Sequence, residues 1–77
     1  MQAMLKREPF FECVFVCERS EYVFHFRAWN AAEAEHHLRE HLRAHGVTAS
    51  GELRVRHPKG GLARCSAYVP DSDGARP

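Results

Sequence analysis

Hydrophobic and polar positions alternate along the first part of this chain, as they do in β-strands. Residues 10–17 (FFECVFVC) and 22–28 (YVFHFRA) are rich in aromatic and β-branched side chains, so each stretch predicts a strand. The polar residues 18–21 are the only break between them, and a break this short predicts a tight hairpin.

The alternation also predicts how the two strands of this hairpin pair. Starting from Cys17 opposite Tyr22, the pairs on one face continue as Phe15 with Phe24, Cys13 with Phe26 and Phe11 with Ala28. The pairs on the opposite face are Val16 with Val23, Val14 with His25 and Glu12 with Arg27. We expect the first face to join the core, and a slip of one residue would exchange the two faces.

A single helix is predicted between Asn30 and Gly46. Asn30 followed by Glu33 is a capping box, and Gly46 is a typical helix stop. Helical periodicity turns one stripe toward the sheet, formed by Ala31, Ala34, Leu38, Leu42 and His45. Glu35 and Arg39 form an i,i+4 ion pair on one flank of that stripe.

Two more strands are predicted after the helix. Residues 52–57 alternate with Leu53 and Val55 inward, and residues 58–61 (PKGG) form a turn. Residues 63–69 then form a fourth strand, whose predicted core side consists of Ala63, Cys65, Ala67 and Val69.

The predicted order of elements is therefore ββαββ, an α+β fold. A right-handed crossover through the helix brings the third strand beside the first, which keeps every neighbouring pair antiparallel. The expected sheet has four strands in the order 2-1-3-4, with the helix packed on one face. We expect a single domain with an ordered core at residues 9–69, an N-terminal arm at 1–8 and a C-terminal tail at 70–77.

The composition, the net charge and the cysteines indicate which ligands and which cellular location to expect. The 77 residues are 44% hydrophobic and carry a net charge of +1, so we expect a packed core and no global field that favours nucleic acid. Cys13 and Cys17 lie four residues apart in one strand, about 13 Å and beyond disulfide range. The chain shows no signal-peptide pattern, and its apolar run is too short for a bilayer. We therefore expect reduced thiols in a cytoplasmic protein without a membrane partner.

The sheet face away from the helix gives the first functional hypothesis. One helix covers only one side, so the other side exposes an apolar patch of Phe10, Val14, Val16, Val23 and Trp29. Such patches mark interfaces, so we expect a non-enzymatic interaction module that binds itself, through this open face, or another protein. The alternative is a half-solvated sheet face that happens to use valine.

A second hypothesis is binding of single-stranded RNA or DNA. It uses basic and aromatic side chains of the open sheet face and of the turn at 57–61, namely Arg27, Arg54, Arg56, Lys59, Arg64 and Tyr68. Arginines among aromatic side chains neutralise phosphates and stack bases on several sheet folds. The near-zero net charge argues against this hypothesis, because such domains usually carry a basic excess.

The helix histidines give a third hypothesis, a metal-linked role. His37, His41 and His45 are spaced one turn apart, and neutral imidazoles at that spacing can share a divalent metal such as zinc. The alternative is a polar helix flank that happens to use histidine. Residues 37–41 also match the H-x-x-E-H motif of inverted zinc peptidases, but Glu40 lies opposite the core stripe and the chain is too short to wall a cleft. We therefore expect neither catalysis nor a required cofactor.

Overall fold

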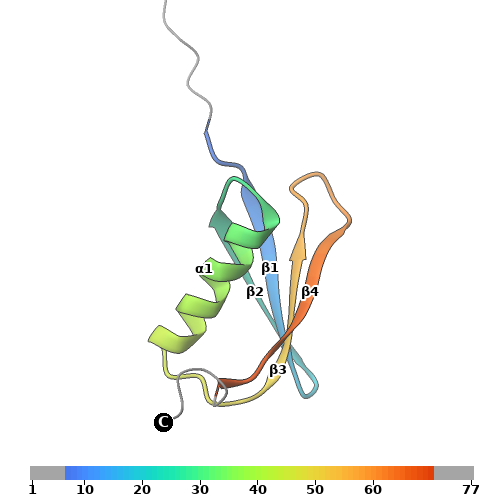
Figure 1. The fold of residues 1–77 in the computed structure, drawn as a ribbon. Helices are drawn as coiled ribbons and strands as arrows, with labels where there is room; N and C mark the ends of the chain where they lie inside the picture. Colours follow the sequence, from blue (N-terminus) through green and yellow to red (C-terminus); the bar gives the residue numbers. More distant parts are fainter. Residues whose placement is uncertain (1–6, 71–77) are drawn as a thin grey trace, which may run out of the picture.

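The computed structural model describes residues 7–70, which form a four-stranded sheet with one helix on one face (Figure 1). The strands are β1 (Phe10–Cys17), β2 (Ser20–Arg27), β3 (Gly51–Arg56) and β4 (Leu62–Tyr68), and helix α1 is Ala31–Ala44. Every neighbouring pair is antiparallel and the order is β2-β1-β3-β4, which confirms the predicted α+β fold. The predicted arm at 1–8 and tail at 70–77 fall almost entirely outside the described residues.

Both ends of α1 are closed by the residues that the sequence indicates. At the start, the Glu33 N–H donates to Asn30 Oδ1 at 2.8 Å, while the Trp29 N–H donates to Glu33 Oε1 at 2.7 Å. At the end, the Gly46 N–H bonds to the Arg43 carbonyl and the Val47 N–H to the Leu42 carbonyl, the two bonds of a Schellman motif. Gly46 has a φ of +69°, a conformation that glycine adopts without strain.

The core lies between α1 and the sheet face that it covers. It consists of Phe11, Cys13, Phe15, Ala28, Ala34, Leu38, Leu42, Leu53, Val55 and Tyr68. The inward prediction for Leu53 and Val55 is confirmed, as is the helix stripe from Ala34 to Leu42. The prediction that His45 lies near the core is wrong, because His45 is the exposed C-cap residue, where the chain already turns away from the helix axis.

The hairpin of β1 and β2 has the predicted faces and a different register. Glu18 and Arg19 alone form the turn, so Cys17 pairs with Ser20 instead of Tyr22. The core-side pairs become Phe15–Tyr22, Cys13–Phe24 and Phe11–Phe26, and the opposite face pairs Val16–Glu21, Val14–Val23 and Glu12–His25. A shift of two residues keeps each side chain on its face. A two-residue turn matches the twist of the strands but requires a residue with positive φ. Glu18 is that residue, with a φ of 56°.

Strand β4 turns the opposite face to the core from the predicted one. Ser66 pairs with Leu53 and Arg64 with Val55, so Tyr68, Ser66 and Arg64 lie on the helix side. Tyr68 is buried with its ring edge-on to that of Phe15, at 5.6 Å between centroids, and its hydroxyl donates to the Val47 carbonyl at 3.3 Å. The predicted core set of Ala63, Cys65, Ala67 and Val69 is therefore wrong. The side chain of Tyr68 fills space that the small side chains of the other face would leave empty. A bulge at Val55/Arg56 accommodates the one extra residue of β4 in the pairing.

Gly51 opens β3 at a point where the backbone of β1 approaches closely. A Cβ at this position would collide with the Val16 carbonyl and would lie 2.7 Å from Cε1 of Phe15. We predict that Gly51→Ala lowers the free energy of unfolding by about 1–3 kcal/mol, because the chain must shift to relieve the overlap. Chemical denaturation measures the change. Ser50→Ala, at the exposed neighbouring position, is the control and should stay within about 0.5 kcal/mol of the parent. Equal stability of the two variants would contradict the close approach.

Candidate functional site

The sheet face opposite α1, here called the open face, is covered by no element of residues 7–70 (Figure 1). The strand registers place on it Phe10, Glu12, Val14 and Val16 of β1, Glu21, Val23, His25 and Arg27 of β2, Glu52, Arg54 and Arg56 of β3, and Cys65 and Ala67 of β4. The open face thus combines an apolar centre on β1 and β2 with charged rows on β3.

The five residues of the predicted interface differ in their exposure. Phe10, Val23 and Trp29 are 49%, 51% and 54% exposed. Val16 is half-buried, whereas Val14 is only 7% exposed because its neighbours on both sides, Val23 and Arg54, shield it. Val23 thus lies directly beside the shielded Val14, whereas Phe10 lies further along β1 and Trp29 beyond the end of β2, so the exposed apolar side chains form an extended row rather than a ring.

The predicted nucleic-acid residues do not form one surface. Arg64 and Tyr68 lie on the helix side of the sheet, away from Arg27, Arg54 and Arg56. Arg54 Nη2 lies 2.9 Å from Glu52 Oε1, and Arg56 Nε lies 3.9 Å from Glu12 Oε1. Two of the three arginines on the open face thus already have a carboxylate partner within the chain.

The third arginine of the open face is held at the end of β2. The guanidinium of Arg27 lies 4.2 Å above the centroid of the Phe10 ring and donates to the Glu8 carbonyl at 3.0 Å. Arg27 and Trp29 also line a shallow hollow together with Arg7 and Glu8. Lys59 stands apart from these residues, in the exposed turn between β3 and β4.

All three cysteines are free thiols. Cys65 on the open face donates its S–H to Glu52 Oε2 at 2.6 Å, and this hydrogen bond raises the pKa of the Cys65 thiol above its usual 9.0. Cys13 is fully buried, and burial, followed by the charge of Glu12, raises the pKa of its thiol to about 11. Both thiols are therefore protonated at neutral pH.

Of the three histidines of the metal hypothesis, His37 and His41 contact aromatic rings of β2 from α1, and His45 is the C-cap residue beside His41. The ring centroids of His41 and Phe24 are 4.8 Å apart, and those of His37 and Phe26 are 6.0 Å apart. His45 lies with its centroid 4.2 Å from that of His41, and its Nδ1 is 3.0 Å from the His41 carbonyl. Within residues 7–70, no group of three or more His, Cys, Asp or Glu side chains has an arrangement that could hold a metal ion.

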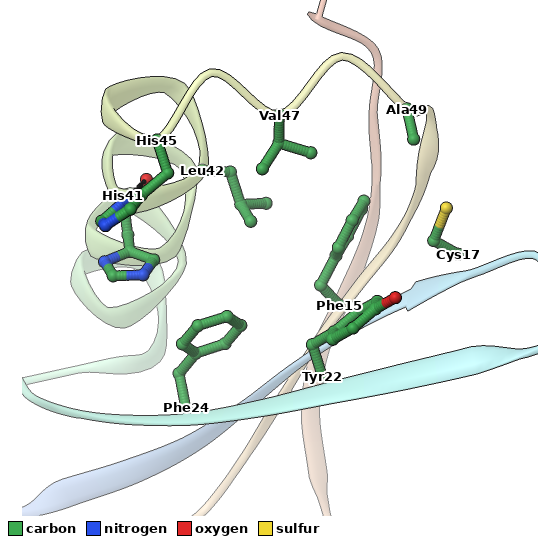
Figure 2. Close-up of a pocket in the computed structure, with 9 residues that line it drawn as sticks. All are labelled: Phe15, Cys17, Tyr22, Phe24, His41, Leu42, His45, Val47 and Ala49. Carbon is green, nitrogen blue, oxygen red and sulfur yellow. Dashed lines mark hydrogen bonds between the residues drawn. The ribbon is translucent and has the colours of Figure 1, made fainter.

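An apolar cavity of about 360 Å³ opens between the end of α1 and the β1–β2 hairpin (Figure 2). Its lining consists of Phe15, Cys17, Tyr22, Phe24, His41, Leu42, His45, Val47 and Ala49. Figure 2 shows the aromatic side chains of β1 and β2 on one side and the two imidazoles on the helix side. This cavity was not predictable from the sequence, because it depends on where α1 ends relative to the edge strand β2.

The carboxylate of Glu35 is buried. Its pair with Arg39 was predicted from the sequence, but its contacts with β4 were not. Glu35 lies between α1 and β4, where its Oε2 accepts from Arg39 at 2.9 Å and from the Ser66 hydroxyl at 2.6 Å. Its Oε1 accepts from Arg64 Nε at 2.6 Å. Arg39 also donates to the Ala67 carbonyl at 2.9 Å. We call Glu35, Arg39, Arg64 and Ser66 the Glu35 cluster, which links the helix to the edge strand β4.

We predict that Glu35→Ala lowers the free energy of unfolding by about 1–3 kcal/mol, because the hydrogen bonds from Arg39, Arg64 and Ser66 are lost at a buried carboxylate. Thermal or urea denaturation measures it. Glu40→Ala is the matched control on the same helix. Its pair with Arg43 is exposed, so its removal should cost no more than about 0.5 kcal/mol. Equal losses for the two variants would show that the Glu35 cluster does not stabilise the fold.

The same cluster predicts a pH dependence of stability. Burial raises the pKa of Glu35, but the hydrogen bonds from Ser66, Arg64 and Arg39 outweigh it, so the pKa lies below its ordinary 4.5. The unfolded chain therefore takes up the proton first as the pH falls. The stability advantage of the parent over Glu35→Ala should be complete above pH 4.5 and should shrink as the pH falls through the lowered pKa. Melting curves of both proteins between neutral and acidic pH test this, and an advantage that grew on acidification would contradict it.

Comparisons of the chain with protein-family models, with curated proteins and with solved structures found no match. Among residues 7–70, the helix is not long and apolar enough to cross a membrane. The surfaces described above are consequently the basis for a functional proposal.

Proposed function

We propose that this chain is a non-enzymatic protein-interaction module that self-associates through its open face. The observation that carries the proposal is the uncovered apolar row on that face, in which the half-exposed Val23 lies beside Val14 and the half-exposed Phe10 lies further along the same strand as Val14, with Trp29 exposed just beyond the end of β2. Burying these side chains against a second copy removes apolar area from water, which is the main favourable contribution to association.

The charges of the open face support this proposal. Glu12 is paired with Arg56, and Glu52 is paired with Arg54, so the charged rows are already neutralised within one copy. Removing a charge from water costs less free energy when the charge is already paired. A paired charge also repels the same charge on a second copy less strongly. The same pairing leaves fewer free cations for phosphate groups, which disfavours the nucleic-acid alternative.

The raised pKa values of two thiols, those of Cys13 and Cys65, support the non-enzymatic part of this proposal. A nucleophilic cysteine needs a lowered pKa, whereas Cys13 has a pKa of about 11 and the pKa of Cys65 is raised by its hydrogen bond to Glu52. Glu35 accepts hydrogen bonds from Arg39, Arg64 and Ser66, so its carboxylate is occupied by structural contacts.

A charge placed on the open face tests the proposal. Val16→Lys introduces an ammonium between the cross-strand neighbours Glu21 and Glu52, which can pair with it in a single copy. In an associated pair, the same ammonium must be desolvated at the interface. We predict that the parent has a solution mass above that of one copy, and that Val16→Lys halves this mass in light scattering on a sizing column.

Ala32→Lys, on the exposed side of α1, is the matched control and should leave the mass unchanged. The emission of Trp29, the single tryptophan, provides a second readout, because it should shift to shorter wavelength with protein concentration in the parent and not in Val16→Lys. A parent that has the mass of one copy, or a Val16→Lys protein with the parent's mass, would overturn self-association through the open face.

A further inference from the structure

Strand β2 is an end strand of the sheet, and its outer edge carries backbone groups to which no strand within residues 7–70 bonds. Cys17 and Ser20 flank a two-residue turn, so they form a hydrogen-bonded pair. The Ala28 N–H likewise bonds to the Pro9 carbonyl at 3.1 Å. Since hydrogen-bonded pairs alternate along an antiparallel ladder, the even-numbered residues of β2 bond inward to β1. The N–H and C=O groups of Glu21, Val23, His25 and Arg27 therefore point outward.

The two edges of the sheet differ in how they are protected. At the other edge, β4 pairs with β3 through a bulge, is followed by Pro70, and its Ala67 carbonyl accepts from Arg39. In contrast, β2 pairs with β1 over eight residues without a shift, and its sequence SEYVFHFR contains no proline, lysine or glycine. A long, regular and unprotected edge strand is a template for pairing with another strand.

The helix-side residues of β2 are incompletely buried. Tyr22 is 50% exposed, and Phe24 and Phe26 are only half-buried, although both pack against the core. The apolar cavity opens beside Tyr22 and Phe24, at this same edge (Figure 2). Aromatic side chains that belong to a core but remain half exposed indicate that another element completes that core.

We propose that β2 pairs antiparallel with β2 of a second copy of this chain, with Phe24 opposite Phe24, so that two sheets join into one of eight strands. The backbone fixes the possible registers. Only outward-pointing, odd-numbered residues can form the hydrogen-bonded pairs of the new ladder, so even-numbered residues must face even-numbered ones.

Side-chain chemistry selects among these registers. With Phe24 opposite Phe24, Glu21 of each copy faces Arg27 of the other, which gives two ion pairs across the two-fold axis. On the helix side, Tyr22 faces Phe26 of the other copy, so three successive aromatic pairs line the junction. Val23 then faces His25. Every position of β2 from 21 to 27 thus meets a compatible side chain.

The neighbouring registers are less favourable. With Val23 opposite Val23, Arg27 faces Arg19 of the other copy, a contact between like charges, and Glu21 faces His25, so both Glu21–Arg27 ion pairs are lost. With His25 opposite His25, Glu21 faces Trp29 and Arg27 faces Val23, which leaves both charges without a partner. Electrostatic complementarity therefore favours the Phe24-centred register.

This edge is a different surface from the centre of the open face, so the two interfaces can be separated by experiment. His25→Pro removes an outward N–H, which a prolyl ring tolerates at a sheet edge, and leaves the inward ladder intact. We expect His25→Pro to halve the solution mass of both the parent and the Val16→Lys protein. In the Val16→Lys protein, in which the open face no longer associates, His25→Ala keeps the N–H and is the control that should retain the mass. If His25→Pro leaves both masses unchanged, edge pairing is wrong, whatever Val16→Lys does.

Charge exchange tests the register. Glu21→Arg and Arg27→Glu should each weaken edge association, measured in the Val16→Lys background, by about tenfold in the dissociation constant, because each replaces two attractive contacts by repulsive ones. The double variant E21R/R27E restores opposite charges and should recover most of the affinity. If the double variant instead loses as much affinity as the two single variants combined, the proposed register is wrong.

Cross-linking tests the same register by distance. Facing residues of a non-hydrogen-bonded pair have Cα atoms about 4.5 Å apart, within disulfide range. In a background with Val16→Lys, Cys17→Ser and Cys65→Ser, in which association through the open face is removed, we expect Phe24→Cys to form an intermolecular disulfide on mild oxidation and Val23→Cys not to. Preferential cross-linking of Val23→Cys would show the competing register, and cross-linking of neither variant would contradict the Phe24-centred pairing.

Discussion

Small side chains at the start of α1 allow its backbone to lie directly against the sheet, and this close contact determines how the rest of the molecule is arranged. Ala34 and Ala28 are fully buried, and the thiol of Cys13 lies 3.9 Å from the Ala34 carbonyl. From this contact Leu38 and Leu42 extend over Leu53 and Val55, so one helix of 14 residues seals one face of the sheet. The core of so small a domain is marginal, which gives the Glu35 cluster and the buried Tyr68 a large share in fixing β4.

The same geometry explains which surfaces remain open. A helix that packs on one face leaves the other face to solvent, and a helix that lies across the sheet leaves its edge strands partly uncovered. Edge strand β4 is fastened by Arg39, Arg64 and Ser66 around Glu35. Edge strand β2 has aromatic side chains instead, which remain half exposed beside an apolar cavity. The surfaces that we propose for association are thus the parts of the sheet that α1 does not reach.

The local signals in the sequence predicted the fold well, and contacts between distant residues account for the errors. Asn30, Glu33 and Gly46 define the helix through short-range hydrogen bonds, and alternation alone places Cys13 and Val14 on opposite faces. In β4, alanine and cysteine alternate with serine and arginine, so polarity favoured the wrong face. The correct face depends on Glu35, which is 29 residues from Arg64 and 31 from Ser66. The strand residues that expose apolar side chains on the open face were predictable from alternation. The separation of Arg64 and Tyr68 from Arg27, Arg54 and Arg56 was not, because it follows from the reversed face of β4.

The most direct test that a second copy completes this sheet is amide hydrogen exchange along β2, followed by NMR at each residue. In a single copy, Tyr22 and Phe24 bond to β1 and exchange slowly, whereas the outward N–H groups of Val23 and His25 have no strand to bond to and exchange fast. Pairing with a second β2 predicts that Val23 and His25 become protected as the protein concentration rises, to a degree that approaches their even-numbered neighbours. Fast exchange at Val23 and His25 at every concentration would contradict completion of the sheet at this edge.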